Sequence, residues 1–258
     1  MTAREIEDYM LTLGDNGQRR VLERFFKTAP GEYGHGDRFL GIRVPQTRQV
    51  VKAACRVTPL DEMEKLLHSP WHEVRLCGLL LMVAMFEDNA KKRLLNDTAA
   101  MRQRDRVLTT YLANATRANN WDLVDLSAPK LLGTWLLVPT ALPDGTPGMN
   151  ADYKRQVMDR LALSTCLWEQ RIGMVCTWKT LQQGDPAYCL RYAEKHLHHP
   201  HDLMQKAVGW MLREMGKRVS IELLRQFLSL HAHEMPRTML RYAIEKMSES
   251  ERASWMEY

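Results

Sequence analysis

The stretch HEVRLCGLLLMVAM, residues 72–85, decides the fold class. It begins with polar and charged side chains and continues as an apolar stripe. Along the chain around it, apolar residues recur at steps of three and four, which is the spacing of amphipathic helices. We find no convincing run of strict alternation that would predict a strand. The sequence therefore predicts an all-α protein.

Four later segments resemble this stretch in pattern, and each has a polar or charged fourth residue before an apolar stripe. They are DLVDLSAPKLLGTW (122–135), WEQRIGMVCTWKTL (168–181), LMQKAVGWMLREMG (203–216) and EMPRTMLRYAIEKM (234–247). Most carry a small residue about three places further on, where helices can approach closely. The fourth residues are separated by 50, 46, 35 and 31 positions, and they are Arg75, Asp125, Arg171, Lys206 and Arg237. These spacings bracket the HEAT and armadillo range and predict an α-solenoid of degenerate two-helix HEAT-like repeats.

Stacked repeats place equivalent positions in a row along one face of the solenoid, which is often the concave face. Four of the five fourth residues are cationic, so the row predicts a basic concave face that tracks a phosphate backbone. An alternative interpretation is that repeat starts are simply polar and solvated.

One domain is expected over residues 1–258, because no segment is long enough to separate independent domains. Helices are predicted to fill most of the chain. Two irregular, Pro- and Gly-rich segments, 30–45 and 138–150, are predicted to be surface loops.

Composition and charge narrow the class of protein. The chain has 45% hydrophobic and 26% charged residues, which excludes wholesale disorder. A net charge of +5 permits a nucleic-acid partner without requiring one. Five scattered cysteines without a CxxC pair argue against a disulfide framework and fit a reducing cytoplasm. The start, MTAREIEDYM, lacks the apolar core of a secretion signal, and the longest apolar run is too short to span a bilayer.

The segment NNWDLVD contains the pair of residues best suited to chemistry on a cation. Trp121 and Asp125 are four residues apart, so on a helix they share one face with Cβ atoms about 5–6 Å apart. The indole attracts positive charge, and a partly desolvated carboxylate stabilises it more strongly. An alternative is that Trp121 fills the core and Asp125 serves an ion pair. Asp122 lies off this face and is expected to cap the helix.

Two later segments extend this pattern. Arg171 stands at the equivalent position of the next repeat. Lys206, Trp210 and Arg213 are spaced at i, i+4 and i+7, again on one helix face. Two tryptophans, one carboxylate and several cations are thus candidates for one groove.

These residues carry a resemblance to a known family. The chain resembles the AlkD-like DNA glycosylases, the HEAT-like-repeat enzymes of DNA alkylation repair, through most of its length. The resemblance rests on FLGIRVP (39–45), HEVR (72–75), WDLVD (121–125), WEQR (168–171) and QKAVGWMLRE (205–214).

The resemblance implies that the protein excises positively charged alkylated purines, such as 3-methyladenine and 7-methylguanine, from duplex DNA in base-excision repair. On the family pattern Asp125 is the catalytic carboxylate, which stabilises an oxocarbenium-like transition state. Trp121 and Trp210 contact the deoxyribose of the lesion, and Arg171 is an active-site arginine. The DNA backbone is expected to be held by Arg43, Arg75, Lys206, Arg213 and Arg237.

No metal and no cofactor are expected, because the alkylated base is already cationic and leaves as a neutral purine. The dense histidine segment 196–201 is predicted to be an exposed turn at a helix end and not a metal site. The expected partner is duplex DNA carrying alkylated bases. The protein is expected to act as a monomer in a bacterial-type cytoplasm, at the nucleoid, with no membrane and no obligate protein partner.

Two other classes of function stay open at this point. A non-catalytic HEAT-like solenoid that binds branched or damaged DNA keeps the basic face but does not need Asp125. A protein-binding scaffold needs an exposed apolar patch in place of a basic groove. Lesion preference and the roles of Tyr33 and of the 138–150 loop also stay open.

Overall fold

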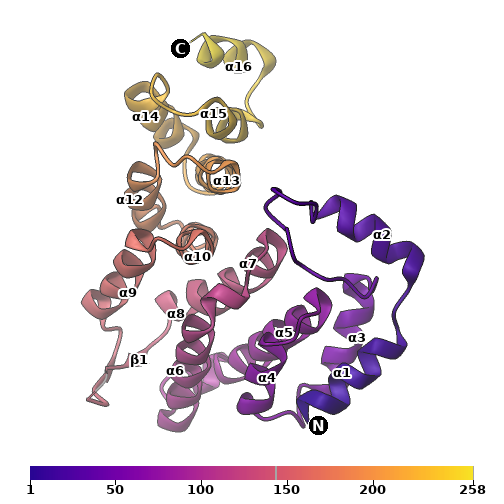
Figure 1. Ribbon diagram of the computed structural model, residues 1–258. Helices are drawn as coiled ribbons and strands as arrows, with labels where there is room; N and C mark the ends of the chain where they lie inside the picture. The colour runs from indigo at the N-terminus through magenta and orange to yellow at the C-terminus, as the bar shows by residue number, and fades with distance from the viewer. Residues whose placement is uncertain (143, 258) are drawn as a thin grey trace. The chain divides into compact units, whose positions relative to one another are not determined.

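The fold is described for residues 1–142 and 144–257 of a computed structural model (Figure 1). Residues 26–43 form a longer irregular segment in which Phe39, Leu40 and Ile42 are buried, so the predicted surface loop 30–45 lies partly in the core. The other described residues form helices joined by shorter turns, and their only strands are β1 (Thr140–Ala141) and β2 (Pro147–Gly148), which pair antiparallel. The all-α prediction is therefore confirmed. Among the helices of the described ranges, none combines the length and apolarity needed to cross a bilayer.

Tertiary contacts divide the chain into two compact units. The first contains residues 1–127 and 138–149, and the second contains residues 128–137 and the chain from Asn150 onward. Each unit is described by itself below. The expected single domain and the concave basic face stay predictions.

The first unit is built around one long buried helix, α5 (His72–Asn89). Almost every side chain of α5 from His72 to Val83 is buried, because helices pack against it on several sides. Gly78 allows close approach, since a Cβ there would lie 2.9 Å from the Leu66 side chain. The other helices of this unit are α1 (Ala3–Thr12), α2 (Asn16–Phe25), α3 (Val44–Ala54), α4 (Leu60–Leu67), α6 (Thr98–Ala113) and α7 (Trp121–Ser127), with short 3-10 turns η1 (Lys92–Leu94) and η2 (Ala115–Arg117).

The second unit is built in the same way around α13 (Asp202–Arg218), which packs on its neighbours in sequence (Figure 1). Gly209 brings α13 against the next helix pair, since a Cβ there would lie 2.4 Å from the Met239 carbonyl. Paired helices with small residues at the contact are the predicted HEAT-like pattern. The other helices are α8 (Thr134–Leu137), α9 (Ala151–Leu163), α10 (Leu167–Val175), α11 (Trp178–Leu181), α12 (Ala187–Lys195), α14 (Ile221–His231), α15 (Arg237–Ile244) and α16 (Glu249–Met256).

The apolar spacing over residues 121–137 predicts one continuous helix, but this helix is broken in the structure. Helix α7 ends at Ser127, and a π turn, η3 (Pro129–Gly133), precedes α8. Pro129 has no N–H to continue the α-helical ladder, and the Gly133 N–H instead reaches the Ala128 carbonyl five residues back, at 3.0 Å. The break leaves α7 as a two-turn helix that belongs to the first unit.

Within the 138–150 segment, β1 and β2 form a short hairpin that is fastened to the first unit. Asp105 of α6 accepts hydrogen bonds from the Thr140 hydroxyl and the Ala141 N–H. The buried Arg104 guanidinium donates to four carbonyls, those of Asn89, Leu94, Leu95 and Pro139. The predicted surface loop is therefore tied to the core by a buried arginine that no sequence pattern had placed inside. Pro143, one of its prolines, lies outside the described residues.

Candidate functional site

Helix α7 carries the two residues that the sequence singled out in the first unit. Leu123, Val124 and Ser127 are buried and anchor the helix, which packs on α5. Trp121 and Asp125 are half-buried and, four residues apart, lie on the other side of the helix. The predicted juxtaposition of the indole and the carboxylate is thus a property of this helix.

Both residues line an open cavity of about 480 Å³. Its walls are largely apolar and come from helix α2, the 39–45 segment, α5 and α7. Polar groups of Gln18, Arg43, His72, Glu73 and Asp122 also line it. Asp125 is therefore neither sealed in the interior nor fully in water. A carboxylate beside apolar walls acts on a nearby positive charge more strongly than one in bulk water.

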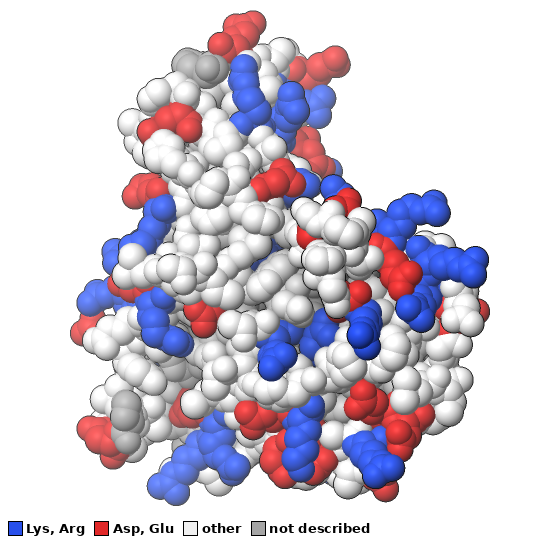
Figure 2. Space-filling view, viewed as in Figure 1, with Lys and Arg blue, Asp and Glu red and all other residues white. Residues whose placement is uncertain are grey.

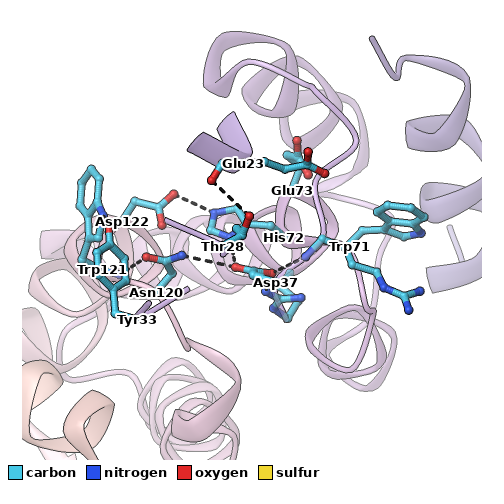
Figure 3. Close-up of polar contacts among 12 residues, drawn as sticks. Glu23, Thr28, Tyr33, Asp37, Trp71, His72, Glu73, Asn120, Trp121 and Asp122 are labelled. Atoms are coloured by element: carbon cyan, nitrogen blue, oxygen red, sulfur yellow. Dashed lines mark hydrogen bonds and ion pairs between the residues drawn. The ribbon is translucent and has the colours of Figure 1, made fainter. Parts of the chain in front are cut away.

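An aromatic cluster holds the Trp121 indole in place. Phe26 stacks on it with centroids 5.4 Å apart, and Phe25 meets it edge-on at 5.8 Å. The Trp121 Nε1–H donates to the Tyr33 hydroxyl oxygen at 3.3 Å (Figure 3). Tyr33, whose role the sequence left open, is thus a direct partner of the proposed active-site tryptophan. Phe25 is 60% exposed, so the cluster presents an aromatic ring at the surface.

A chain of buried charges fixes the start of α7. His72, the first residue of α5, lies between Asp37 (Nδ1 to Oδ2, 2.8 Å) and Asp122 (Nε2 to Oδ2, 2.9 Å) (Figure 3). Arg75 closes the chain with a 2.6 Å ion pair to Asp37. Burial alone lowers the pKa of His72, but the Asp122 and Asp37 carboxylates outweigh it and raise that pKa to about 9. The imidazole is therefore protonated at neutral pH and donates to both carboxylates.

The same network corrects two sequence interpretations. Asp122 was expected to cap α7, whereas its carboxylate binds His72 and the Asn120 side chain accepts the Trp121 N–H at 2.9 Å. Arg75 was expected to hold the DNA backbone, but it is only 5% exposed and donates to Asp37 and to the Ser69 carbonyl. We therefore remove Arg75 from the direct DNA contacts, because its guanidinium is engaged inside the protein.

Glu73 is a structural residue of the site that sequence reasoning missed. Its buried carboxylate accepts the backbone N–H groups of Leu40, Gly41 and Ile42 at 2.8–3.0 Å. Gly41 has a φ of +88°, and a Cβ there would lie 2.0 Å from the Asp15 carbonyl. The hydrogen bonds from Leu40, Gly41 and Ile42 to Glu73 fix the segment that carries Arg43 to the cavity. The only available signal was an acid in the first turn of an otherwise apolar helix.

Two predicted DNA-binding residues, Arg43 and Arg75, lie in the first unit, and of these Arg43 is exposed. It lines the cavity, and its Nε donates to the Gln18 side chain at 3.3 Å. Across the face displayed in Figure 2, basic and acidic side chains are interspersed. On this face, the distribution of charge alone does not mark a site.

The remaining predicted residues lie in the second unit. Arg171 is 4% exposed and donates from Nη1 to the Leu203 carbonyl at 2.5 Å, whereas Trp210 is half-buried on α13. Lys206 pairs with Asp202 at 2.6 Å, and Arg213 forms an ion pair with Glu245. The exposed Arg237 donates to the Met256 carbonyl at 2.9 Å. Their expected part in one site with Asp125 stays a prediction.

The histidine segment 196–201 has structural roles. His201 caps α13 by accepting the Leu203 N–H at 3.1 Å, and His199 bonds the Gln170 side chain at 2.8 Å. His196 is buried, not exposed as expected, and burial lowers its pKa to about 4. Among the described residues, no three His, Cys, Asp or Glu side chains gather in a way that suits a metal ion.

Comparisons with known proteins agree with this architecture. Residues 6–247 match the model of a family described as DNA alkylation repair enzyme. Among solved structures, the chain is similar to a predicted DNA alkylation repair enzyme from Enterococcus faecalis, with a TM-score of 0.68 and 13% identity over 92% of this chain and 97% of that chain. At this identity the likeness shows the fold alone. The comparison with curated proteins gave no match.

The family match extends over nearly the whole chain and includes every helix that builds the cavity, the charge network and α13. The all-α fold of paired helices agrees with it independently. The chain belongs to the family of DNA alkylation repair enzymes.

Proposed function

We propose that the protein is a DNA glycosylase that removes positively charged alkylated purines, of the 3-methyladenine and 7-methylguanine type, from duplex DNA. The observation that carries the proposal is the placement of Asp125 and Trp121 side by side on the wall of an open, largely apolar cavity. Both residues are half-buried at the cavity, whereas Leu123 and Val124 of the same helix are fully buried.

The chemistry follows from where charge moves. An alkylated purine is cationic while it is attached to the sugar and becomes neutral when the N-glycosidic bond breaks. Positive charge then develops on the deoxyribose, and the Asp125 carboxylate stabilises this oxocarbenium-like centre and orients water toward its anomeric carbon. No general acid is required, because the leaving base needs no proton.

The aromatic cluster suits the sugar that carries this charge. A ring face attracts a nearby cation by about 0.5–2 kcal/mol, and the Trp121 ring is held in one orientation by Phe26 and Tyr33. A ring fixed before the substrate arrives loses no rotamer freedom in the transition state.

The backbone of the duplex is assigned to Arg43, Lys206, Arg213 and Arg237, which bind phosphate without reading sequence. Arg171 and Trp210 are assigned to the reaction by the family resemblance, and each is testable by its own variant. We expect the protein to act as a monomer, in the cytoplasm, without metal or cofactor.

The test is release of 7-methylguanine from methylated duplex DNA under single-turnover conditions. We expect Asp125→Asn to slow release by about 100- to 1000-fold while DNA affinity stays close to that of the wild type. Asp61→Asn, an exposed carboxylate on α4, is the matched control and should release base at the wild-type rate.

Two outcomes would reject the proposal. Equal rates for wild type and Asp125→Asn would remove Asp125 from the chemistry. Tight, salt-sensitive DNA binding by the wild type without any base release would favour a non-catalytic DNA-binding protein.

A further inference from the structure

A second cavity in the first unit, of about 430 Å³, lies at the start of helices α5 and α7. Three segments build it: the loop 36–38, the turn 68–70 before α5, and the turn 116–119 before α7. It borders the first cavity through one contact, because Asp37 lines the second cavity and its hydrogen-bonded partner His72 lines the first.

The lining of this second cavity is polar and cationic. Arg38, Arg75 and Arg117 face it, against the single carboxylate of Asp37. That carboxylate is already neutralised from inside, since its oxygens bind Arg75 at 2.6 Å and His72 at 2.8 Å. Arg38 and Arg117 therefore contribute positive charge that no acid of the cavity balances.

The two outer arginines are also available to a ligand. Both are exposed, and neither guanidinium has an ion-pair partner within residues 1–142 and 144–257. Arg75 lines the same cavity with 95% of its surface buried, and its Nε has no hydrogen-bond partner there. The cavity thus combines exposed guanidinium donors with an inner arginine fixed in place behind them.

We propose that this cavity binds a backbone phosphate of the DNA, through the guanidinium groups of Arg38 and Arg117. Guanidinium presents paired N–H donors that match phosphate oxygens, which a point charge does not. Arg117 precedes Trp121, the first residue of α7, by four residues. The residue that would hold the phosphate is therefore close in sequence to the proposed catalytic helix. The inference rests on the proposed DNA substrate but not on base release.

Binding of a duplex measured between about 50 and 200 mM salt tests the site. Arg38→Ala and Arg117→Ala should each weaken binding about tenfold or more, as expected for loss of a charge-assisted hydrogen bond. The double variant should reduce the slope of log affinity against log salt by about 0.9, the value of one phosphate contact. Arg117→Lys should retain the slope and lose affinity, because the charge stays and the paired donors go.

The matched control is the double variant Arg56→Ala and Arg93→Ala, which removes two exposed arginines of the same unit outside the cavity. Its salt slope should stay at the wild-type value. Thermal unfolding of every variant checks that the fold is retained, which the exposure of both cavity arginines makes the expected result.

A duplex series with single neutral methylphosphonates locates the contact. One position should weaken wild-type binding and have no effect on the Arg38→Ala, Arg117→Ala double variant. If the double variant keeps the wild-type slope and sensitivity at every position, the phosphate site is overturned. Stabilisation of the wild type by inorganic phosphate, lost in that variant while its DNA slope is unchanged, would overturn DNA as the source of the phosphate.

The same samples separate this inference from the proposed function. If the double variant has a reduced salt slope but the wild type releases no base, the glycosylase proposal is rejected and the phosphate site is retained. If the wild type releases base but the double variant keeps the wild-type salt slope, the glycosylase proposal is retained and the phosphate site is rejected.

Discussion

The imidazole of His72 lies 2.9 Å from the carboxylate of Asp122, and this contact ties α7 to the first residue of α5. Asp122 directly follows Trp121 and precedes Asp125 by three residues. The position of the proposed catalytic pair therefore depends on this buried ion pair.

This network predicts a pH dependence of stability. The folded pKa of His72 is about 9, above the ordinary 6.5, so its stabilisation is complete below about 6.5 and is lost as pH rises through about 9. The change in the free energy of unfolding should be on the order of 3 kcal/mol. Urea unfolding at several pH values measures it. His72→Gln should abolish most of this slope, and an identical slope in that variant would assign it to other groups.

The contact of Glu73 with three backbone N–H groups predicts a large effect of a small change. Glu73→Gln replaces one acceptor oxygen by an NH₂ group that faces an N–H donor. We expect a loss of about 3 kcal/mol in the free energy of unfolding, together with weaker DNA binding because Arg43 is displaced. Chemical denaturation and duplex binding measure the two effects. Glu249→Gln, at an exposed position, should change neither. Wild-type stability in Glu73→Gln would contradict the role of the carboxylate.

The cluster around Trp121 predicts graded effects on base release. Tyr33→Phe removes only the hydroxyl that accepts the indole N–H, so its rate should fall by about tenfold or less. Trp121→Ala removes the ring itself and should slow single-turnover release further. Trp121→Phe keeps a smaller ring, so its rate should lie between the rates of Tyr33→Phe and Trp121→Ala. A Trp121→Ala enzyme as fast as the wild type would show that the ring does not act on the sugar.

The hydrogen bonds of buried Arg104 predict that replacing this residue lowers stability but leaves DNA affinity unchanged. Its buried guanidinium donates to four carbonyls, which a lysine with one ammonium group cannot reach together. Arg104→Lys should lower the free energy of unfolding by about 2 kcal/mol or more. Arg102→Lys on the exposed side of the same helix is the control, with an expected change within about 0.5 kcal/mol. A Kd for DNA that rises with Arg104→Lys, at a temperature where the variant is folded, would place Arg104 in the interface instead.

Most of the helices, and the pairing of Trp121 with Asp125, follow from local sequence patterns, whereas the break after Ser127 does not. Apolar spacing at three and four residues fixes which side of a helix is buried, and capping residues such as Asp97, Ser220 and Ser248 set where helices begin. These are local properties of a few consecutive residues. The i, i+4 pair is of the same kind, so its juxtaposition follows from helix geometry alone.

Which polar residues are buried depends on contacts between segments that are distant in the sequence. Asp37 and His72 are 35 residues apart, and Asp122 is a further 50, so no local pattern pairs them. Arg75 and Arg104 read as helix-surface cations, yet the structure surrounds them with acceptors from distant loops. Whether an arginine faces water or a carbonyl depends on segments that meet only when the chain folds, because burial of a charge is favourable only when its partners are in place.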